Sequence, residues 1–127
     1  MMIEFLLLVM ILMHIIDDFV LQSACLYKLK QKEYWESAGE KYKNDYVAGL
    51  LIHSISWSIM IMLPILLFLD LSEGALFMYG WVILMAILHA CIDHEKANAK
   101  TINLWQDQLI HFVQIMVTYI VFISIFG

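Results

Sequence analysis

Histidine and aspartate recur at one spacing inside the apolar segments of this chain. Three pairs stand four residues apart: His14 with Asp18, His89 with Asp93, and Asp107 with His111. In a helix this spacing places both side chains on one face, one turn apart. The zinc motif HExxH presents two ligands to one metal in the same way. A further apolar segment carries a lone histidine, His53. The pattern therefore predicts a metal site to which several helices contribute.

The expected metal ligands are the six paired residues: His14, Asp18, His89, Asp93, Asp107 and His111. Mixed imidazole and carboxylate ligands suit Zn, Mn, Fe or Ni and argue against Cu(I), which prefers sulfur. With His53 added, the candidates exceed the four ligands of one tetrahedral zinc. Either two ions share the site, or some carboxylates act as a base or orient other ligands. For catalysis we expect Asp18 and Asp107 as ligand or base, and His53 as ligand or hydrogen-bond donor.

Polar neighbours extend the same helix faces. Three glutamines lie close to the pairs: Gln22, Gln108 and Gln114. We expect their amides to orient the metal ligands through hydrogen bonds. Two lysines, Lys28 and Lys96, are expected at the rim of the site, where an ammonium group can hold a phosphate or a lipid head group.

The composition predicts that lipid surrounds the elements carrying these residues. Of the 127 residues 63% are hydrophobic and 15% are charged, against about a half and a quarter in soluble domains. A net charge of −5 excludes the basic face of a nucleic-acid binder. A spanning helix needs about 20 mostly apolar residues, and four segments qualify: 1–22, 47–69, 75–97 and 104–126. We therefore expect one all-α domain, 1–127, folded as a four-helix transmembrane bundle with antiparallel neighbours.

The connection at 23–46 differs from the two tight turns, because its lysines alternate with aromatic residues. It is interpreted as one or two amphipathic helices on the membrane surface, broken near Gly39, or as a solvated loop. All seven lysines fall on one side of the four-span topology, which the positive-inside rule makes cytoplasmic. Both termini are then non-cytoplasmic, in the cell (inner) membrane. At 1.5 Å per residue, the seven His and Asp candidates all lie roughly 5 to 15 Å from the cytoplasmic helix ends.

These motifs together resemble a known family. They are His14-x3-Asp18-Phe19-x2-Gln22 with Lys28 following, a lone His53, His89-x3-Asp93-x2-Lys96, and Asp107-Gln108-x2-His111. The combination resembles small bacterial and phage membrane proteins catalogued as domain of unknown function 3307, over nearly the whole chain. The chain departs from that pattern at Cys25 and at His94-Glu95, which touch the rim and not the candidates. The resemblance implies a membrane location and these polar positions, but no particular activity.

Three classes of function fit the pattern. The first is a membrane-embedded, metal-dependent hydrolase acting on a lipid-linked or cytoplasm-accessible substrate. The chain is loosely similar in style to membrane-bound metal-dependent hydrolases, which also place His and Asp near one membrane face. The second is a divalent-metal or proton-coupled transporter, which would need a homo-oligomer to build a path. The third is a structural or interaction protein whose buried polar side chains bond the helices together. Membrane lipids are the expected partners, and a homo-oligomer stays open.

Overall fold

The computed structural model describes residues 2–127, and every regular element in that range is helical, which confirms the all-α expectation. The four long helices are α1 (Met2–Ile16), α4 (Tyr46–Phe68), α5 (Ala75–His94) and α6 (Leu104–Phe126). Two short helices, α2 (Ala24–Leu29) and α3 (Lys32–Ala38), and a 3₁₀ turn, η2 (Glu40–Tyr42), fill the first connection. Two π-helical segments, η1 (Asp17–Leu21) and η3 (Glu95–Ala99), continue α1 and α5.

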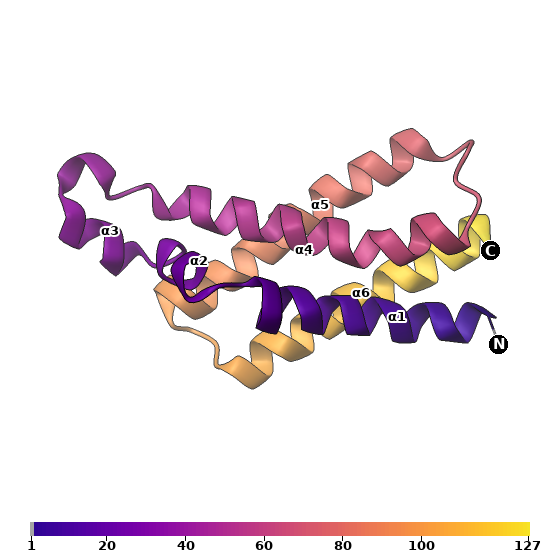
Figure 1. The fold of residues 1–127 in the computed structure, drawn as a ribbon, viewed down its shortest axis with the longest axis horizontal. Coiled ribbons are helices and arrows are strands. Elements are labelled where there is room, and N and C mark those ends of the chain that lie inside the picture. The colour runs from indigo at the N-terminus through magenta and orange to yellow at the C-terminus, as the bar shows by residue number, and fades with distance from the viewer. Residues whose placement is uncertain (1) are drawn as a thin grey trace.

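The long helices pack side by side (Figure 1). Helices α4 and α6 each contact both α1 and α5, and α2 packs against α4. The N and C ends lie at one end of the structure with the turn between α4 and α5, while α2 and α3 lie at the opposite end (Figure 1). The seven lysines stand in the first connection and in the connection between α5 and α6. They therefore gather at the end that carries α2 and α3.

Three helical segments are long and apolar enough to cross a membrane: Glu40–Phe68, Ala75–Ala99 and Leu104–Phe126. The first helix is shorter, with 15 residues before its π-helical continuation. It also carries the acidic residues Glu4, Asp17 and Asp18. The structure thus allows a membrane location, and the fourth span and the four-helix transmembrane bundle stay predictions.

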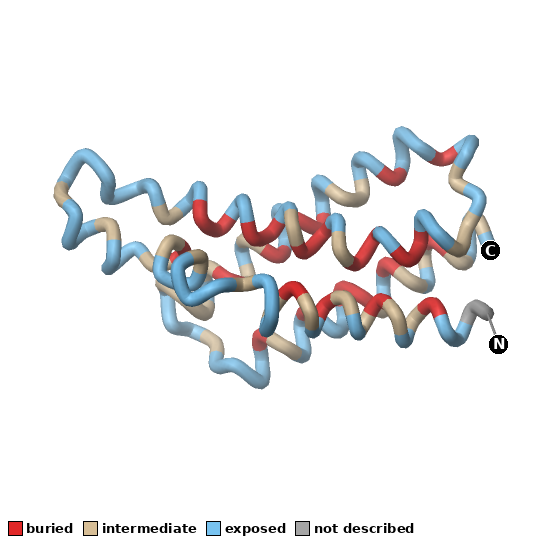
Figure 2. The backbone as a smooth tube through the Cα atoms, in the orientation of Figure 1, coloured by how far each residue is buried: buried red, intermediate tan, exposed pale blue. Residues whose placement is uncertain are grey.

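Buried residues lie where the long helices face one another (Figure 2). Toward the termini the interior is mainly apolar, with Leu6, Met10, Ile61, Ile65 and Phe122 all at most 1% exposed. Toward α2 and α3 it is polar and contains the histidines and aspartates of the predicted site. The outward surface of the long helices carries large exposed apolar side chains, among them Leu67 and Leu76.

Local sequence signals set where the helices begin and end. The side chain of Asn103 accepts a hydrogen bond from the N–H of Gln106 (3.0 Å), and the Gln106 side chain accepts one from the N–H of Asn103 (2.9 Å). This capping box starts α6 one turn before Asp107. Gly39 ends α3 with a φ of +120°, a conformation that side chains other than glycine's rarely allow. The two short helices and this break agree with the sequence interpretation, and their place on a membrane surface stays a prediction.

Candidate metal centre

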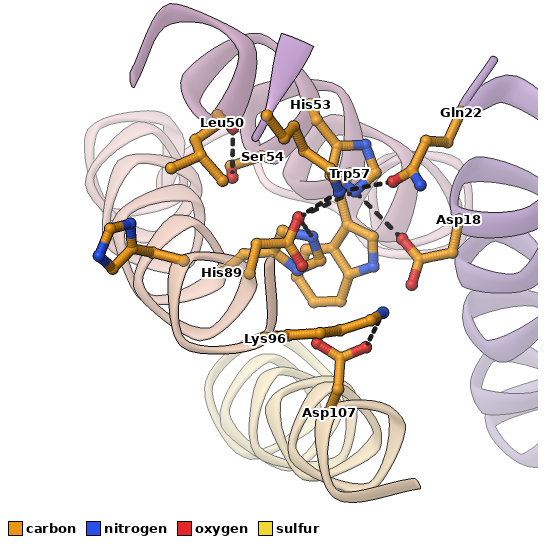
Figure 3. A network of polar contacts seen from close by, with 12 residues as sticks. Asp18, Gln22, Leu50, His53, Ser54, Trp57, His89, Lys96 and Asp107 are labelled. Atoms are coloured by element: carbon orange, nitrogen blue, oxygen red, sulfur yellow. Dashed lines mark hydrogen bonds and ion pairs between the residues drawn. The ribbon is translucent and has the colours of Figure 1, made fainter. Parts of the chain in front are cut away.

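A layer of histidine and aspartate side chains crosses the interior on the side of α2 and α3. Its members come from η1 and from all three long helices that follow: Asp17, Asp18, His53, His89, Asp93, Asp107 and His111. Figure 3 shows Asp18, His53, His89 and Asp107 extending from separate helices toward a common region around Trp57. The three histidines are at most 1% exposed, so the layer lies inside the protein. We call it the His/Asp layer.

The carboxylate of Asp93 lies at the middle of the His/Asp layer. Its Oδ2 is 3.5 Å from His53 Nε2 and 3.7 Å from His89 Nε2. Its Oδ1 is 3.5 Å from His111 Nε2. The two oxygens of this one side chain therefore face different histidines. Beyond them, His53 Nε2 is 3.3 Å from an oxygen of Asp18.

Two groups of ligand atoms lie close enough to hold a metal ion, with all atoms of a group within 4.8 Å of one another. One group is Asp18, His53 and His89, and the other is His89, Asp93 and His111. Asp18 Oδ1 and the Nε2 atoms of all three histidines are buried without a hydrogen-bond partner in the part of the chain that the structure describes. A buried polar atom without a partner costs about 1–3 kcal/mol. A cation among these atoms would satisfy all of them, so the residues fit a divalent metal.

The charges of the His/Asp layer point the same way. Four carboxylates, those of Asp17, Asp18, Asp93 and Asp107, are largely or fully buried, and the ammonium groups of Lys30 and Lys96 are paired with two of them. With neutral histidines, two negative charges are left over, which is what one divalent cation neutralises. Unpaired buried charge is strongly destabilising. A bound cation would remove that cost.

The far nitrogens of two histidines have partners of their own. His111 Nδ1 is 2.9 Å from Gln114 Oε1, the role expected of Gln114 from the sequence. His53 Nδ1 is 3.5 Å from Asp17 Oδ2, and Asp17 Oδ1 accepts a hydrogen bond of 2.6 Å from Ser56 Oγ. Histidines that bind metals usually have such a partner, which fixes the ring and leaves the other nitrogen for the metal. Both contacts leave Nε2 facing the His/Asp layer.

Asp17 is a site residue that the sequence interpretation did not predict. Neighbouring residues of an α-helix point about 100° apart, so a regular helix would not turn both Asp17 and Asp18 inward. The chain forms the π-helical segment η1 there, and both carboxylates approach His53. Such π-helical turns are frequent at functional sites.

His14 does not take the expected place of a ligand. Its Nδ1 accepts a hydrogen bond from Trp57 Nε1 (2.7 Å), so its Nε2 carries the proton and lies 3.1 Å from Gln108 Oε1. Neither group of ligand atoms includes it. The amide nitrogen of Gln108 donates to Asp18 Oδ2 and to Asp107 Oδ2, both at 3.1 Å. In this structure His14 thus orients Gln108, which in turn holds two carboxylates.

Trp57 closes the His/Asp layer on the side of the apolar core. It is fully buried, one turn along α4 from His53. Its ring stacks on His89 with centroids 4.3 Å apart, and His89 stacks on His111 at 4.0 Å. Ile61 follows one turn further along α4 and belongs to the apolar core. The tryptophan therefore fixes the imidazole rings and separates polar from apolar interior.

On the opposite side the layer opens into a pocket of about 260 Å³, which we call the lysine pocket. Asp93 forms part of its wall, together with Lys30, Lys96 and Lys100. Lys30 is only 4% exposed. It donates to Asp93 Oδ2 (2.7 Å) and to Gln22 Oε1 (2.6 Å). The sequence interpretation did not single out Lys30, and it expected Gln22 to orient a ligand directly.

The two lysines expected at the rim differ in position. Lys96 lines the lysine pocket and donates to Asp107 Oδ2 at 2.6 Å (Figure 3). Lys28 is exposed on α2 and is not part of the pocket wall. At the mouth, Lys100 donates to Glu33 Oε1 (2.6 Å), and this hydrogen bond lowers the pKa of the exposed Glu33 carboxyl. Three lysines therefore surround the entrance, and only one of them was predicted to do so.

Comparisons of the chain with known protein families, with curated proteins and with solved structures found no match. The resemblance to domain of unknown function 3307 stays a prediction.

Proposed function

We propose that this protein is a membrane-embedded, metal-dependent hydrolase whose site opens toward the cytoplasm. One observation carries the proposal: buried nitrogen and oxygen atoms from three helices and η1 converge without hydrogen-bond partners, among four buried carboxylates of which two have a lysine partner. Helix-bonding side chains would be expected to satisfy one another, and these do not. The substrate is lipid-linked or reaches the site from the cytoplasm.

The residues divide into roles by their contacts. Asp18, His53, His89, Asp93 and His111 supply the atoms that would hold one or two ions, Zn, Mn or Fe being consistent with these ligands. A bound divalent ion lowers the pKa of a water and polarises the bond to be cleaved. Asp107 faces His111 Nε2 at 3.2 Å and serves as a further ligand or as the base. The two groups have His89 in common, so two ions bound together would have to share the ligands of the layer.

The membrane placement rests on the surface and on the lysines. Three helical segments have the length and hydropathy to cross a bilayer, and their outward faces are apolar. We propose that α1 with η1 is the fourth span, since Asp17 is buried against α4 rather than turned to lipid. The lysine-rich end is then cytoplasmic in the cell inner membrane, and both termini are on the other side.

The apolar core supports an enzyme over a transporter. From Trp57 toward the termini the interior is mainly filled by Met10, Ile61, Ile65 and Phe122, and the polar side chains buried there are few: Ser58, Gln114 and Thr118. An ion path through a membrane protein needs polar groups or water along its length. A single chain thus offers a site with one entrance.

The test is the metal content of the purified protein, measured by mass spectrometry beside two variants. We expect about one or two equivalents of a divalent metal in the unmodified protein, retention in Asp45→Ala, and loss in Asp93→Ala. Asp45 is an exposed carboxylate at the same end of the protein, without a side-chain cap bond. Equal metal content in both variants would remove the basis of the proposal. Transport is tested separately, by metal flux into liposomes, for which we expect no signal above empty liposomes.

A further inference from the structure

The lysine pocket shares a wall with the metal centre. Asp93 contacts the three histidines of the His/Asp layer and also lines the pocket. A molecule in the pocket would therefore be linked to any metal held by Asp93 through this carboxylate and through Lys30, which is bonded to it. At about 260 Å³ the pocket is several times larger than the roughly 30 Å³ occupied by one water. It has room for a tetrahedral oxyanion.

The three lysines of the pocket come from separate segments and are held in place. Lys30 follows α2, Lys96 belongs to η3, and Lys100 follows η3. The side chain of Asn98 joins these segments: it donates to Lys30 O (3.0 Å) and accepts from the backbone N–H of Lys32 (2.6 Å). The backbone at Lys30 is therefore held against η3 by the side chain of Asn98.

Each ammonium group has a carboxylate partner and spare donors. An ammonium group offers three N–H donors. Within the described part of the chain, Lys30 uses two of them, on Asp93 and Gln22, and Lys96 uses one, on Asp107. Lys100 uses one on Glu33. The remaining donors can bind an anion without breaking the existing pairs.

The charge of the site changes sign with its metal content. With neutral histidines and no metal, the His/Asp layer and its two paired lysines carry two net negative charges. One divalent cation makes the site neutral, and a second gives it two positive charges. A phosphate monoester carries about two negative charges near neutral pH. Such a group would neutralise a site that holds two ions.

We propose that the lysine pocket binds the phosphate group of a phosphate monoester substrate, and that phosphate and the second metal ion bind cooperatively. The proposal rests on the proposed function, because it requires a metal at Asp93. By linkage, phosphate must strengthen metal binding by the same factor by which metal strengthens phosphate binding. The effect of phosphate on metal affinity and the effect of metal on phosphate affinity can both be measured.

The experiment titrates the purified full chain in detergent with Mn²⁺, followed by electron paramagnetic resonance, with and without inorganic phosphate. We expect one tight ion without phosphate and two with it, and phosphorus relaxation that reports phosphate next to Mn²⁺. Lys30→Met should weaken phosphate binding at least about tenfold, because it removes a charge-assisted hydrogen bond. Lys100→Met, at an exposed pair, should weaken it about threefold.

The matched control is Lys43→Met, an exposed lysine paired with Glu40 outside the pocket, which should leave phosphate binding unchanged. We expect Lys100→Met to fold normally, since both Lys100 and Glu33 are exposed, so this variant tests the proposal even if Lys30→Met does not fold. If Mn²⁺ binds but phosphate changes neither its affinity nor its stoichiometry, the phosphate proposal is overturned and the proposed function stands. If Mn²⁺ does not bind at all, both fall.

The source of the phosphate is distinguished by competition in nanodiscs. Phosphatidic acid carries the same phosphate monoester on a lipid, and phosphatidylglycerol carries a diester as the comparison. Phosphatidic acid that displaces inorganic phosphate supports a lipid substrate. Binding of inorganic phosphate that phosphatidic acid does not affect supports a soluble one. If neither inorganic phosphate nor phosphatidic acid binds, the proposal is overturned.

Discussion

The pair of Lys30 and Asp93 joins the lysine pocket to the His/Asp layer through one contact of 2.7 Å. Both side chains are at most 6% exposed, so neither can turn to water if its partner is lost. Buried pairs of this kind add little net stability over apolar residues, but removing one partner is costly. The same carboxylate can exchange the ammonium for a metal ion as its main partner. The effect of losing Lys30 should therefore depend on metal.

We predict that Lys30→Met lowers the free energy of unfolding of the metal-free protein by about 3–5 kcal/mol, because Asp93 is left buried and unpaired. Addition of Mn²⁺ should recover most of this loss, since the cation then pairs with the carboxylate. Unfolding in detergent, with and without Mn²⁺, measures both values, and Lys43→Met is the control. The same loss with and without metal would mean that Asp93 is not a ligand.

Asp17 acts through His53 rather than through a metal. We predict that Asp17→Asn weakens metal binding about 10–100-fold, the usual effect of losing the carboxylate that orients a ligating histidine. Ser56→Ala should act in the same direction but less strongly, because it frees Asp17 Oδ1 without removing the carboxylate. Metal titrations of these two variants and of Asp45→Asn give the comparison. A normal affinity in Asp17→Asn would show that the 3.5 Å contact with His53 is incidental.

At the scale of the helices, a spacing of four residues orders the interior into layers. The buried side chains at this spacing include His53, Trp57 and Ile61 along α4, and Asp107, His111 and Ile115 along α6. Because four residues make about one turn, each step moves one layer from the polar end toward the apolar core. The pairs and their common depth could be read from the sequence for this reason alone.

What the sequence could not predict lies where the helices are irregular. Asp17 faces inward only because η1 is π-helical, and nothing in Asp17–Leu21 distinguishes that geometry from an α-helix. Lys30 and Lys28 stand in one basic stretch, and the burial of Lys30 follows from how α2 packs against α4 and η3. Hydropathy and spacing report on regular helices. Hydropathy and spacing do not predict how the connecting segment between two long helices packs against them.

Helix α2 approaches α4 at Gly49, so a substitution of this glycine tests the packing of α2. A Cβ at Gly49 would lie 2.4 Å from the backbone oxygen of Leu29, whereas a Cβ at Gly80 on α5 would meet nothing within 4 Å. We predict that Gly49→Ala displaces α2 with Lys30, lowers the free energy of unfolding by about 1–3 kcal/mol, and weakens phosphate binding.

Gly80→Ala is the matched control, and it should raise the free energy of unfolding by about 0.5–1 kcal/mol through helix propensity. Unfolding and phosphate titrations of the two alanine variants test the difference. If Gly49→Ala behaves like Gly80→Ala, the close approach of α2 does not determine where Lys30 lies.

At the scale of the whole molecule, all lysines lie at one end and the described ends of the chain at the other. We predict that a cysteine at Ser72 reacts with an impermeant thiol reagent from outside intact cells and that a cysteine at Lys41 does not, since the positive end is retained in the cytoplasm. Both native cysteines, Cys25 and Cys91, are exposed and must first be replaced by serine. Labelling of position 41 from outside would reverse the proposed orientation.

The apolar half of the interior also has an electrical consequence. In the proposed orientation, the packed Met10, Ile61, Ile65 and Phe122 separate the metal centre from the non-cytoplasmic face. Most of the membrane voltage then falls across this insulating half, because the other half opens to water through the lysine pocket. Moving one elementary charge through a full 100 mV changes its energy by about 2.3 kcal/mol, and an ion entering from the cytoplasm crosses little of that drop. Metal occupancy in energised cells should therefore follow the free metal concentration of the cytoplasm and be insensitive to collapse of the membrane potential.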